Sequence, residues 1–256
     1  MIALVTGASS GIGKDISIEL AKKGYDIILV ARNIERLQAV KETIEKNFNR
    51  NCYIKTVELS DRNACIKLHE EVKNEFGIID ILINNAGFGL CGKFKENDLN
   101  KEISMIDTNI TSLHILTKLF LQDMDDKKKE RHIMNVASIA GFMPGPLMAT
   151  YYATKSYVVR LSQALNEELK SDKSKVKMHV LCPGPVDTNF NKTAEVRFSL
   201  RGVSSEYVAD YAVRKMFKNK LLIFPGIGIK ISVTGAKFLP ANWMAQMCFS
   251  MQKKKL

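Results

Sequence analysis

A tyrosine and a lysine four residues apart are the side chains of this sequence best placed to move a proton. Tyr151 and Lys155 fall near the start of a strongly helical segment, so both side chains project from one helix face. A phenol has an ordinary pKa of about 10, and a nearby ammonium favours its ionised form. Unit charges about 5 Å apart at an effective dielectric constant of about 20 interact by roughly 3 kcal/mol, or about 2 pKa units. We therefore expect Lys155 to bring the pKa of Tyr151 toward neutrality.

A serine thirteen residues before that tyrosine extends the candidate site. Ser138 closes an apolar strand-like run, and its hydroxyl is suited to hold a substrate oxygen while Tyr151 exchanges the proton. A Tyr-x-x-x-Lys pair alone is usually structural, with the tyrosine at the edge of the core and the lysine solvated. Ser138 and the glycine-rich loop described next favour the catalytic interpretation. Tyr152 is the neighbouring alternative, but it is three residues from Lys155, and we expect it to pack.

A glycine-rich segment, TGASSGIG at residues 6–13, is the candidate binding loop. Small residues let the backbone turn tightly and approach a pyrophosphate, whose charge is met by free N–H groups at a helix N-terminus. A tight strand-to-helix connection is the structural alternative. The segment follows the first apolar run directly and precedes a helical pattern, which favours nucleotide binding. The residues assigned to this contact are Gly7, Ser9, Ser10, Gly11, Ile12 and Gly13.

Positioning these groups requires a fold that brings distant segments to one edge. Short apolar runs alternate with longer amphipathic segments six or seven times, which predicts an α/β, doubly wound parallel sheet of about seven strands with helices on both faces. The expected strands are 2–5, 27–30, 53–59, 79–83, 132–137, 176–181 and 221–224. The expected helices are 13–23, 34–47, 64–76, 101–123, 151–170 and 205–217. Loops near Gly7, Asn84, Ser138 and Pro183 then meet at the carboxyl edge of the sheet, where open α/β sheets bind ligands.

The order and spacing of these motifs resemble the short-chain dehydrogenase/reductase family along nearly the whole chain. Besides the glycine-rich loop, the matching segments are N-N-A-G at residues 84–87 and P-G-P-V-D-T at residues 183–188. The resemblance implies a catalytic tetrad of Asn109, Ser138, Tyr151 and Lys155, with Asn109 supporting a water-mediated proton relay and Lys155 also gripping the nicotinamide ribose. It further implies cofactor contacts from Asp61 at the adenine, from Asn85, Ala86 and Gly87, and from Pro183, Gly184, Val186 and Thr188 beside the nicotinamide.

The charge after the second strand predicts the type of nicotinamide cofactor. An acidic residue there would bond the ribose hydroxyls of NAD and repel a 2′-phosphate, but this chain has Ala31 and Arg32. A guanidinium presents a planar fork suited to phosphate, so we expect NADP(H) to be preferred over NAD(H). The opposing observation is Ser10, which stands where many NADP-preferring relatives carry a basic residue. A plain surface charge is the alternative role of Arg32.

Composition bounds the remaining possibilities. The 256 residues carry 46% hydrophobic and 25% charged residues, as globular proteins do, and no linker or repeat divides them, so we expect one NAD(P)-binding domain over residues 1–256. The formal charge of +11 is spread along the chain without a nucleic-acid-binding motif, and we expect no nucleic-acid partner. Five widely spaced cysteines and four scattered histidines predict neither disulfides nor a metal site. With no signal-peptide pattern and no run of about 20 apolar residues, we expect a cytoplasmic protein.

The C-terminal third bears on the substrate. The resemblance implies a lid at residues 189–203, where Phe190 and Phe198 supply apolar wall, and five more apolar residues between positions 142 and 148 add to it. The extension over residues 226–256 places Trp243, Met244, Met247, Cys248 and Met251 on one helical face. Packing or a subunit contact is the preferred role of this face, and a membrane surface ranks last without being excluded. The extension resembles the family branch of 3-oxoacyl and 17β-hydroxysteroid reductases.

The sequence thus predicts an NADP(H)-dependent oxidoreductase that interconverts a ketone or aldehyde and an alcohol on a mainly hydrophobic small molecule. Two alternatives stay open: a nucleotide-responsive binding protein without catalysis, and a peripheral membrane reductase of lipids. The family resemblance implies a homodimer or homotetramer formed through the helices that contain Asn109 and Tyr151. Thr117, Leu121, Val158 and Leu165 on those helices fit either that contact or internal packing.

Overall fold

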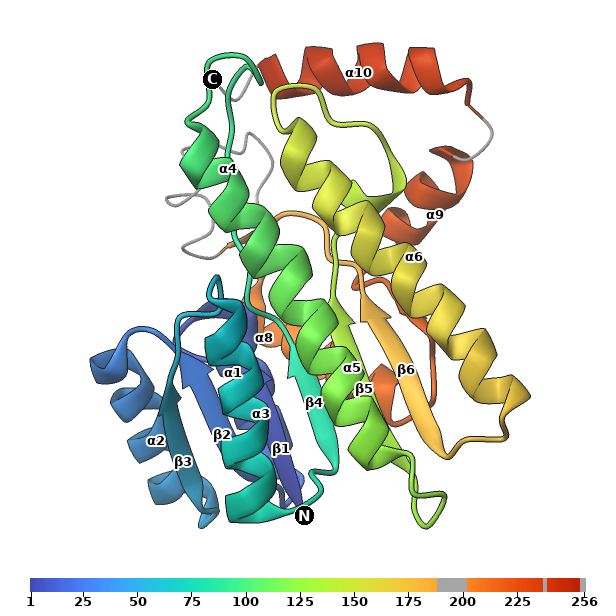
Figure 1. The fold of residues 1–256 in the computed structure, drawn as a ribbon. Coiled ribbons are helices and arrows are strands. Elements are labelled where there is room, and N and C mark those ends of the chain that lie inside the picture. Colours follow the sequence, from blue (N-terminus) through green and yellow to red (C-terminus); the bar gives the residue numbers. More distant parts are fainter. Residues whose placement is uncertain (188–201, 237–238, 254–256) are drawn as a thin grey trace.

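A seven-stranded parallel sheet with helices on both faces forms the body of the protein, as predicted (Figure 1). The computed structural model describes residues 1–187, 202–236 and 239–253. The strand order is β3-β2-β1-β4-β5-β6-β9, and every neighbouring pair is parallel. The strands are β1 (Ile2–Thr6), β2 (Asp26–Ala31), β3 (Cys52–Thr56), β4 (Ile81–Asn84), β5 (Arg131–Val136), β6 (Val176–Leu181) and β9 (Leu222–Ile223). Chain order reverses between β1 and β4, which creates the crevice typical of nucleotide-binding sheets.

The two faces of the sheet are separated by the alternation of apolar side chains along each strand. In β1, Ala3 and Val5 pack toward one face and Leu4 toward the other. The first face is covered by α1 (Gly11–Lys22), α2 (Ile34–Phe48) and α8 (Ser205–Met216). The second is covered by α3 (Arg62–Phe76), α5 (Ser112–Met124) and α6 (Ala149–Ser171). Strands that are apolar on both faces therefore fit a sheet buried on both sides.

The predicted helix over residues 101–123 is divided in the structure. It consists of α4 (Leu99–Ile106), a π-helical turn η1 (Asp107–Thr111) and α5. Asp98 caps α4 through a hydrogen bond from the Lys101 amide to its carboxylate, 2.8 Å long. The π-helical turn contains Asn109, whose side chain is held by the loop after β4 and by α6. A local widening of the helix at a candidate functional residue is a recurrent feature of π-turns.

Two short strands flank the region predicted as the lid. β7 (Val186–Asp187) pairs in parallel with β8 (Val203–Ser204). Thr188, Phe190 and Phe198 lie outside the described residues, as does most of the lid prediction of residues 189–203. The chain continues through α8 and β9 to α9 (Ile227–Ala236) and α10 (Ala241–Lys253). In Figure 1, α10 lies across the end of the molecule toward which the parallel strands point. In the described part of the chain, no helix is long and apolar enough to cross a membrane.

A buried histidine pair joins β5 and β6 at a distance from the candidate site. His179 Nδ1 lies 2.8 Å from the Lys220 carbonyl oxygen, which can only accept, so this nitrogen carries the proton. His179 Nε2 then accepts a hydrogen bond from His132 Nδ1 at 3.1 Å. Burial lowers the pKa of His132 to about 4 and that of His179 to about 4. Both rings are therefore neutral in the folded protein at pH 7.

This pair predicts a loss of stability in mild acid. Unfolded histidines bind protons near pH 6.5, so the folded state loses stability as the pH falls from about 7 through that value toward 4. Between pH 7 and pH 5 carboxylates bind few protons, because their ordinary pKa values are about 4. We expect the free energy of unfolding, from urea titrations at pH 7 and pH 5, to fall by roughly 2–4 kcal/mol. His132→Leu should reduce this difference, whereas replacement of the exposed His114 by Gln should not; an equal difference in both variants would contradict the assignment.

Candidate functional site

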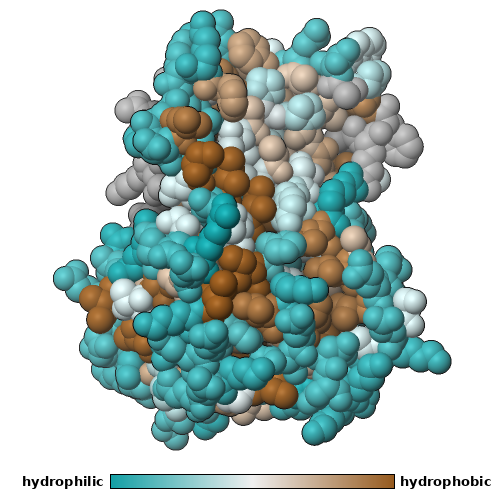
Figure 2. Space-filling model, in the orientation of Figure 1, coloured by the Kyte–Doolittle hydropathy of each residue, from teal (hydrophilic) through white to brown (hydrophobic). Residues whose placement is uncertain are grey.

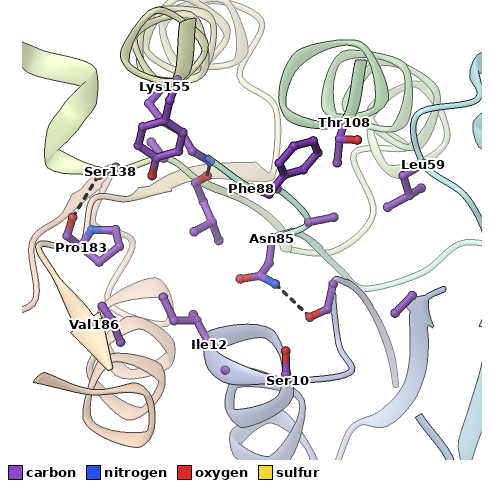
Figure 3. Close-up of a pocket in the computed structure, with 18 of the residues that line it drawn as sticks. Ser10, Ile12, Leu59, Asn85, Phe88, Thr108, Ser138, Lys155, Pro183 and Val186 are labelled. Atoms are coloured by element: carbon purple, nitrogen blue, oxygen red, sulfur yellow. Dashed lines mark hydrogen bonds between the residues drawn. The ribbon is translucent and has the colours of Figure 1, made fainter. Parts of the chain in front are cut away.

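A cavity of about 460 Å³ opens at the carboxyl edge of the sheet and connects the glycine-rich loop to the predicted proton-transfer residues. Figure 3 shows Ser10 and Ile12 at one side of this cavity, Ser138 and Lys155 at the other, and Asn85 between them. Most of the predicted site residues line it: Gly7, Ser9, Ser10, Gly11, Ile12, Arg32, Asn85, Ala86, Gly87, Ser138, Tyr151, Lys155, Pro183, Gly184 and Val186. Gly13, Asp61 and Asn109 are not among the lining residues.

The glycine-rich loop depends on the close approach of two backbones. Gly7 has a φ of +65°, and a Cβ there would lie 2.7 Å from Asn85 Nδ2 and 2.9 Å from Ala86 Cα. A Cβ on Gly13 would collide with the Gly7 carbonyl oxygen and the Asn85 amide. The Asn85 amide donates to the Thr6 carbonyl oxygen at 2.9 Å and so ties the loop after β4 to the loop after β1. Gly13 thus shapes the site from behind without lining it.

The first turn of α1 is open to an anionic ligand. Ser10, the residue before this helix, has extended backbone and, within the described residues, makes no side-chain hydrogen bond to the first-turn amides. By contrast, Asn33, Asp61, Asp98 and Ser204 each accept such bonds at the starts of α2, α3, α4 and α8. Free first-turn amides and a positive helix end facing a cavity suit a phosphate group. The residues present therefore fit the pyrophosphate of a dinucleotide.

Asp61, the predicted adenine contact, also has a structural role. Asp61 caps α3, accepting hydrogen bonds from the amides of Asn63 at 2.8 Å and Ala64 at 3.2 Å. Its Oδ1 atom is thereby engaged at the helix end, while Leu59 and Glu58 of the same connection line the cavity. The residues immediately after β3 form the cavity wall where the adenine contact is predicted. A capping motif explains an aspartate at this place in the sequence.

Two arginines lie at the end of the cavity beside β2 and α2. Arg32 is 72% exposed, and its Nη1 donates to Glu58 Oε2 at 3.2 Å. Burial raises the pKa of Glu58, but hydrogen bonds from Ser60 and Arg32 outweigh it, so the pKa lies below its ordinary value and the carboxylate is ionised at neutral pH. Arg36 also lines the cavity and was missed by the sequence interpretation. Its place in the first turn of α2, four residues after Arg32, is the signal that could have identified it.

Tyr151 and Lys155 project from one face of α6, as their spacing predicts, and both are buried. The Lys155 Nζ atom lies 5.8 Å from the centroid of the Tyr151 ring and donates to the Val136 carbonyl oxygen at 3.0 Å. Burial lowers the pKa of Lys155 to about 8. The amine is thus close to the Tyr151 ring. One of its N–H groups is used in the hydrogen bond to the last residue of β5.

The expected direction of the Tyr151 pKa shift is wrong. Burial raises the pKa of Tyr151 above its ordinary value, while a hydrogen bond with Ser138 lowers it and the neighbouring Tyr152 raises it further. The expectation rests on the attraction between phenolate and ammonium alone, whereas burial, which disfavours the charged phenolate, is the largest cause acting on Tyr151. The phenol is therefore protonated at neutral pH. The contact with Ser138 does fit the expectation that these two side chains act on one substrate atom.

Ser138 stands at the start of a short 3₁₀ turn, η2 (Ile139–Phe142). Its Oγ accepts from the Ala140 amide at 3.2 Å and donates to the Pro183 carbonyl oxygen at 3.4 Å, the bond drawn in Figure 3. These contacts hold the hydroxyl beside the segment Pro183–Val186, where the family resemblance implies a nicotinamide contact. Loops after β5 and β6 therefore meet at the reacting end of the cavity.

Asn109 is buried behind the cavity, where Thr108 provides the wall. Its amide donates to the Phe88 carbonyl oxygen at 2.9 Å and to Thr154 Oγ1 at 3.1 Å, and its Oδ1 accepts from the Phe88 amide at 3.0 Å. All three contacts are with protein groups, so the side chain links the loop after β4 to α6. These hydrogen bonds position the loop after β4 and the helix that carries Tyr151, while the part of Asn109 in a water-mediated proton relay stays a prediction.

The substrate end of the cavity has aromatic and aliphatic walls. Phe88, Met148 and Tyr152 line it. Tyr152 does pack, as expected, but it also faces the cavity, with its ring centroid 6.0 Å from that of Tyr151. Phe142, which the sequence placed in this wall, instead packs its ring against Phe224, 5.6 Å between centroids. Adjacent tyrosines on a helix point in different directions. Both line the cavity because the surrounding loops extend it around this part of α6.

Comparisons with known proteins agree with this geometry. The family model described as short chain dehydrogenase matches residues 1–197. An uncharacterized oxidoreductase of Staphylococcus saprophyticus is 36% identical over 187 residues, covering 73% of this chain and 79% of that protein. Human 17-beta-hydroxysteroid dehydrogenase type 3 is 34% identical over 194 residues, covering 74% of this chain and 60% of that protein.

A solved structure shares both the fold and part of the sequence. The short-chain dehydrogenase of Sphingobium yanoikuyae, in complex with NADPH, superposes with a TM-score of 0.83 at 27% identity, covering 92% of this chain and 93% of that one. The family match spans the glycine-rich loop, Ser138, Tyr151 and Lys155. The chain therefore belongs to the short-chain dehydrogenase/reductase family of oxidoreductases, which interconvert CH–OH and C=O groups with a nicotinamide cofactor.

Proposed function

We propose that this protein is an NADP(H)-dependent reductase, or dehydrogenase in the reverse direction, of a ketone or aldehyde on a mainly hydrophobic molecule of the 3-oxoacyl or steroid type. The observation that carries the proposal is one cavity shared by the open first turn of α1, by Arg32 and by Ser138, Tyr151 and Lys155. The apolar walls at the Tyr151 end support a hydrophobic substrate. The similarity to a 17-beta-hydroxysteroid dehydrogenase supports a steroid as one candidate.

The catalytic roles follow from the contacts of each side chain. Ser138 holds the substrate oxygen, and Tyr151, protonated and hydrogen-bonded to Ser138, donates the proton to that oxygen during reduction. Lys155 supplies positive charge near the phenolate that forms. A bound nicotinamide dinucleotide would supply the hydride in this direction and accept it in the other. Asn109 holds the loop after β4 in its position relative to α6.

The cofactor preference is supported by charge at the ribose end. Arg32 and Arg36 both line the cavity there, and two guanidiniums outnumber the single Glu58 carboxylate. A 2′-phosphate can replace Glu58 as the partner of Arg32. The ribose hydroxyls of NAD leave Arg32 paired with Glu58. These contacts favour NADP(H) over NAD(H).

We also propose the remaining contacts and the domain organisation suggested by the sequence. Gly7, Ser9, Ser10, Gly11 and Ile12 would contact the pyrophosphate, and Asn85, Ala86 and Gly87 the adjoining ribose. Pro183, Gly184 and Val186 would contact the nicotinamide. Thr188 and the lid at residues 189–203 belong to the same proposal, with residues 1–256 forming one domain.

A homodimer or homotetramer is part of this proposal, with α4 and α5 as the candidate contact. Figure 2 shows apolar side chains gathered over α4 and the adjoining part of α5. Leu99 and Ile103 of α4 are among the exposed large hydrophobic residues. Thr117 and Val158 are buried in internal packing, whereas Leu121 and Leu165 are partly buried against the core.

The test of the proposed function is a cofactor-resolved screen. Ketones, including steroids and 3-oxoacyl thioesters, are offered with NADPH and with NADH, and the corresponding alcohols with NADP⁺ and NAD⁺. We expect turnover of at least one hydrophobic carbonyl with NADPH in preference to NADH. Tight NADPH binding without turnover across the screen would instead support a nucleotide-responsive binding protein.

The pKa of Lys155 predicts the pH dependence of reduction. Its amine is protonated below about pH 8 and loses the proton above that value, which removes positive charge beside the Tyr151 phenolate. We expect kcat/KM for reduction to be level between pH 6 and 7 and to fall above about pH 8. Lys155→Arg should move this fall to higher pH, because a guanidinium stays charged. A wild-type profile that stays level to pH 10 would contradict the assignment.

A further inference from the structure

The C-terminal helix α10 has an inner face that packs over the substrate end of the cavity. Met244, Cys248 and Gln252 lie four residues apart on it and are buried. Gln252, only 2% exposed, donates from Nε2 to the Tyr152 hydroxyl at 2.5 Å. Because Tyr152 lines the cavity, α10 lies directly behind the wall of the substrate end. The position of α10 is therefore fixed relative to the active site.

The outer face of α10 is apolar and exposed. We define this outer face as Trp243, Met247 and Met251, which are 64%, 53% and 55% exposed. The sequence interpretation placed these residues on one face with Met244 and Cys248, but packing divides them into a buried and an exposed stripe. Asn242, Gln246 and Ser250 occupy the neighbouring polar side of the helix. A helix with adjacent apolar and polar stripes in contact with solvent has the pattern of an interfacial helix.

Exposed apolar residues are concentrated in this part of the chain. Among the described residues, six of the fourteen exposed large hydrophobic residues fall between positions 231 and 251. Besides the outer face they are Ile231, Leu239 and Phe249. The loop between β4 and α4, whose Phe94 is also exposed, reaches the same end of the molecule in Figure 1. Single exposed hydrophobic residues are ordinary, but the three residues of the outer face lie side by side on one helix, which is the pattern of an interaction surface.

The charge of the segment indicates what this surface contacts. Residues 226–256 contain five lysines and no aspartate or glutamate, a formal charge of +5. An isologous contact with a second copy would bring two such segments together without a carboxylate in either to balance the lysines. An anionic surface balances them directly. Lysines beside an interfacial apolar helix are the combination that binds anionic lipid headgroups.

We propose that the outer face of α10 binds the surface of an anionic lipid bilayer, with the helix axis parallel to the membrane plane. Trp243, Met247 and Met251 enter the boundary between headgroups and acyl chains, and Lys253, in the last turn of α10, contacts the headgroup phosphates. The membrane then lies beside α10, whose buried stripe packs against the wall of the substrate end. The inference concerns a surface and does not depend on which carbonyl compound is reduced.

The experiment is vesicle flotation of the full-length protein. Vesicles of phosphatidylcholine alone are compared with vesicles that also contain phosphatidylglycerol, at low and high salt. We expect the protein to float with the anionic vesicles, and less with neutral vesicles or at high salt. Trp243→Gln with Met247→Gln should lower the partition coefficient at least about tenfold. Lys253→Gln, Lys254→Gln and Lys255→Gln together should lower binding to anionic vesicles by roughly a hundredfold.

The matched control replaces two exposed isoleucines on and beside α3, Ile66→Gln with Ile78→Gln, which should leave flotation unchanged. Unchanged NADPH binding and thermal unfolding show that each variant is folded. The proposal is overturned if the wild type does not float, if the Trp243 and Met247 variant floats as the wild type does, or if the control variant loses binding equally. A wild-type dimer that the α10 variant converts to monomers, without vesicle binding, would also overturn it and assign the face to a second copy.

Discussion

Replacing Tyr151 with phenylalanine lowers kcat for carbonyl reduction by roughly a hundredfold to ten-thousandfold, the range that general acid catalysis contributes. The substitution removes the hydroxyl that donates the proton and leaves the buried ring in place. NADPH binding, measured by fluorescence titration, should change little. The measurement is steady-state reduction of the substrate found in the screen, with kcat and KM determined separately.

The control for this experiment is the neighbouring residue. Tyr152→Phe also removes one phenolic hydroxyl at the cavity wall, but that hydroxyl contacts Gln252 and not Ser138. We expect Tyr152→Phe to keep kcat within about tenfold of the wild type and to act mainly on KM, because it changes a wall and not the proton donor. Wild-type turnover by Tyr151→Phe, or an equal loss in both variants, would rule out the assigned proton donor.

Replacing Arg32 with alanine weakens NADPH binding by roughly tenfold to a hundredfold and leaves NADH binding within about threefold. The expected loss corresponds to one charge-assisted contact with the 2′-phosphate, which NADH lacks. Dissociation constants for both cofactors, measured by calorimetry or fluorescence, give the ratio directly. The same comparison with Arg36→Ala shows whether the second guanidinium at the ribose end shares this role.

Arg62 provides a matched control for the cofactor experiment. Its side chain is 70% exposed and forms one ion pair, with Asp107 at 3.4 Å, much as Arg32 is 72% exposed and paired with Glu58. Arg62→Ala removes the same charge from a place that does not line the cavity. If Arg32→Ala and Arg62→Ala weaken NADPH binding equally, the effect comes from net charge. If Arg32→Ala weakens NADH and NADPH alike, the contact does not distinguish them.

The sheet was predictable because its strands are short apolar runs with side chains buried on both faces. The same holds for the pairing of Tyr151 and Lys155, which helical spacing alone places on one face. The direction of the Tyr151 pKa shift was not predictable, because it depends on how completely other segments bury the phenol. Spacing reports which groups share a face, and solvation depends on what packs over that face.

Other parts of the site depend on contacts between segments that no local pattern records. The π-helical turn at Asn109 coincides with hydrogen bonds to Phe88 and Thr154, which lie 21 and 45 residues away in the chain. The capping role of Asp61 was visible locally, but its absence from the cavity wall was not. The division of the α10 apolar residues into buried and exposed stripes was likewise not predictable. It depends on the contact of α10 with Tyr152, which lies 100 residues before Gln252 in the chain.

The absence of a side-chain cap at the start of α1, among the described residues, links ligand binding to folding. Four other helices begin with a side chain that accepts their first-turn N–H groups, whereas α1 begins at Ser10 without such a bond in the described residues. A dinucleotide phosphate there would complete that helix end, so the ligand also acts as a structural component. At a concentration one hundred times its dissociation constant, it would add about 2.7 kcal/mol to the free energy of unfolding. Cellular cofactor supply would thereby influence how long each copy of the protein survives.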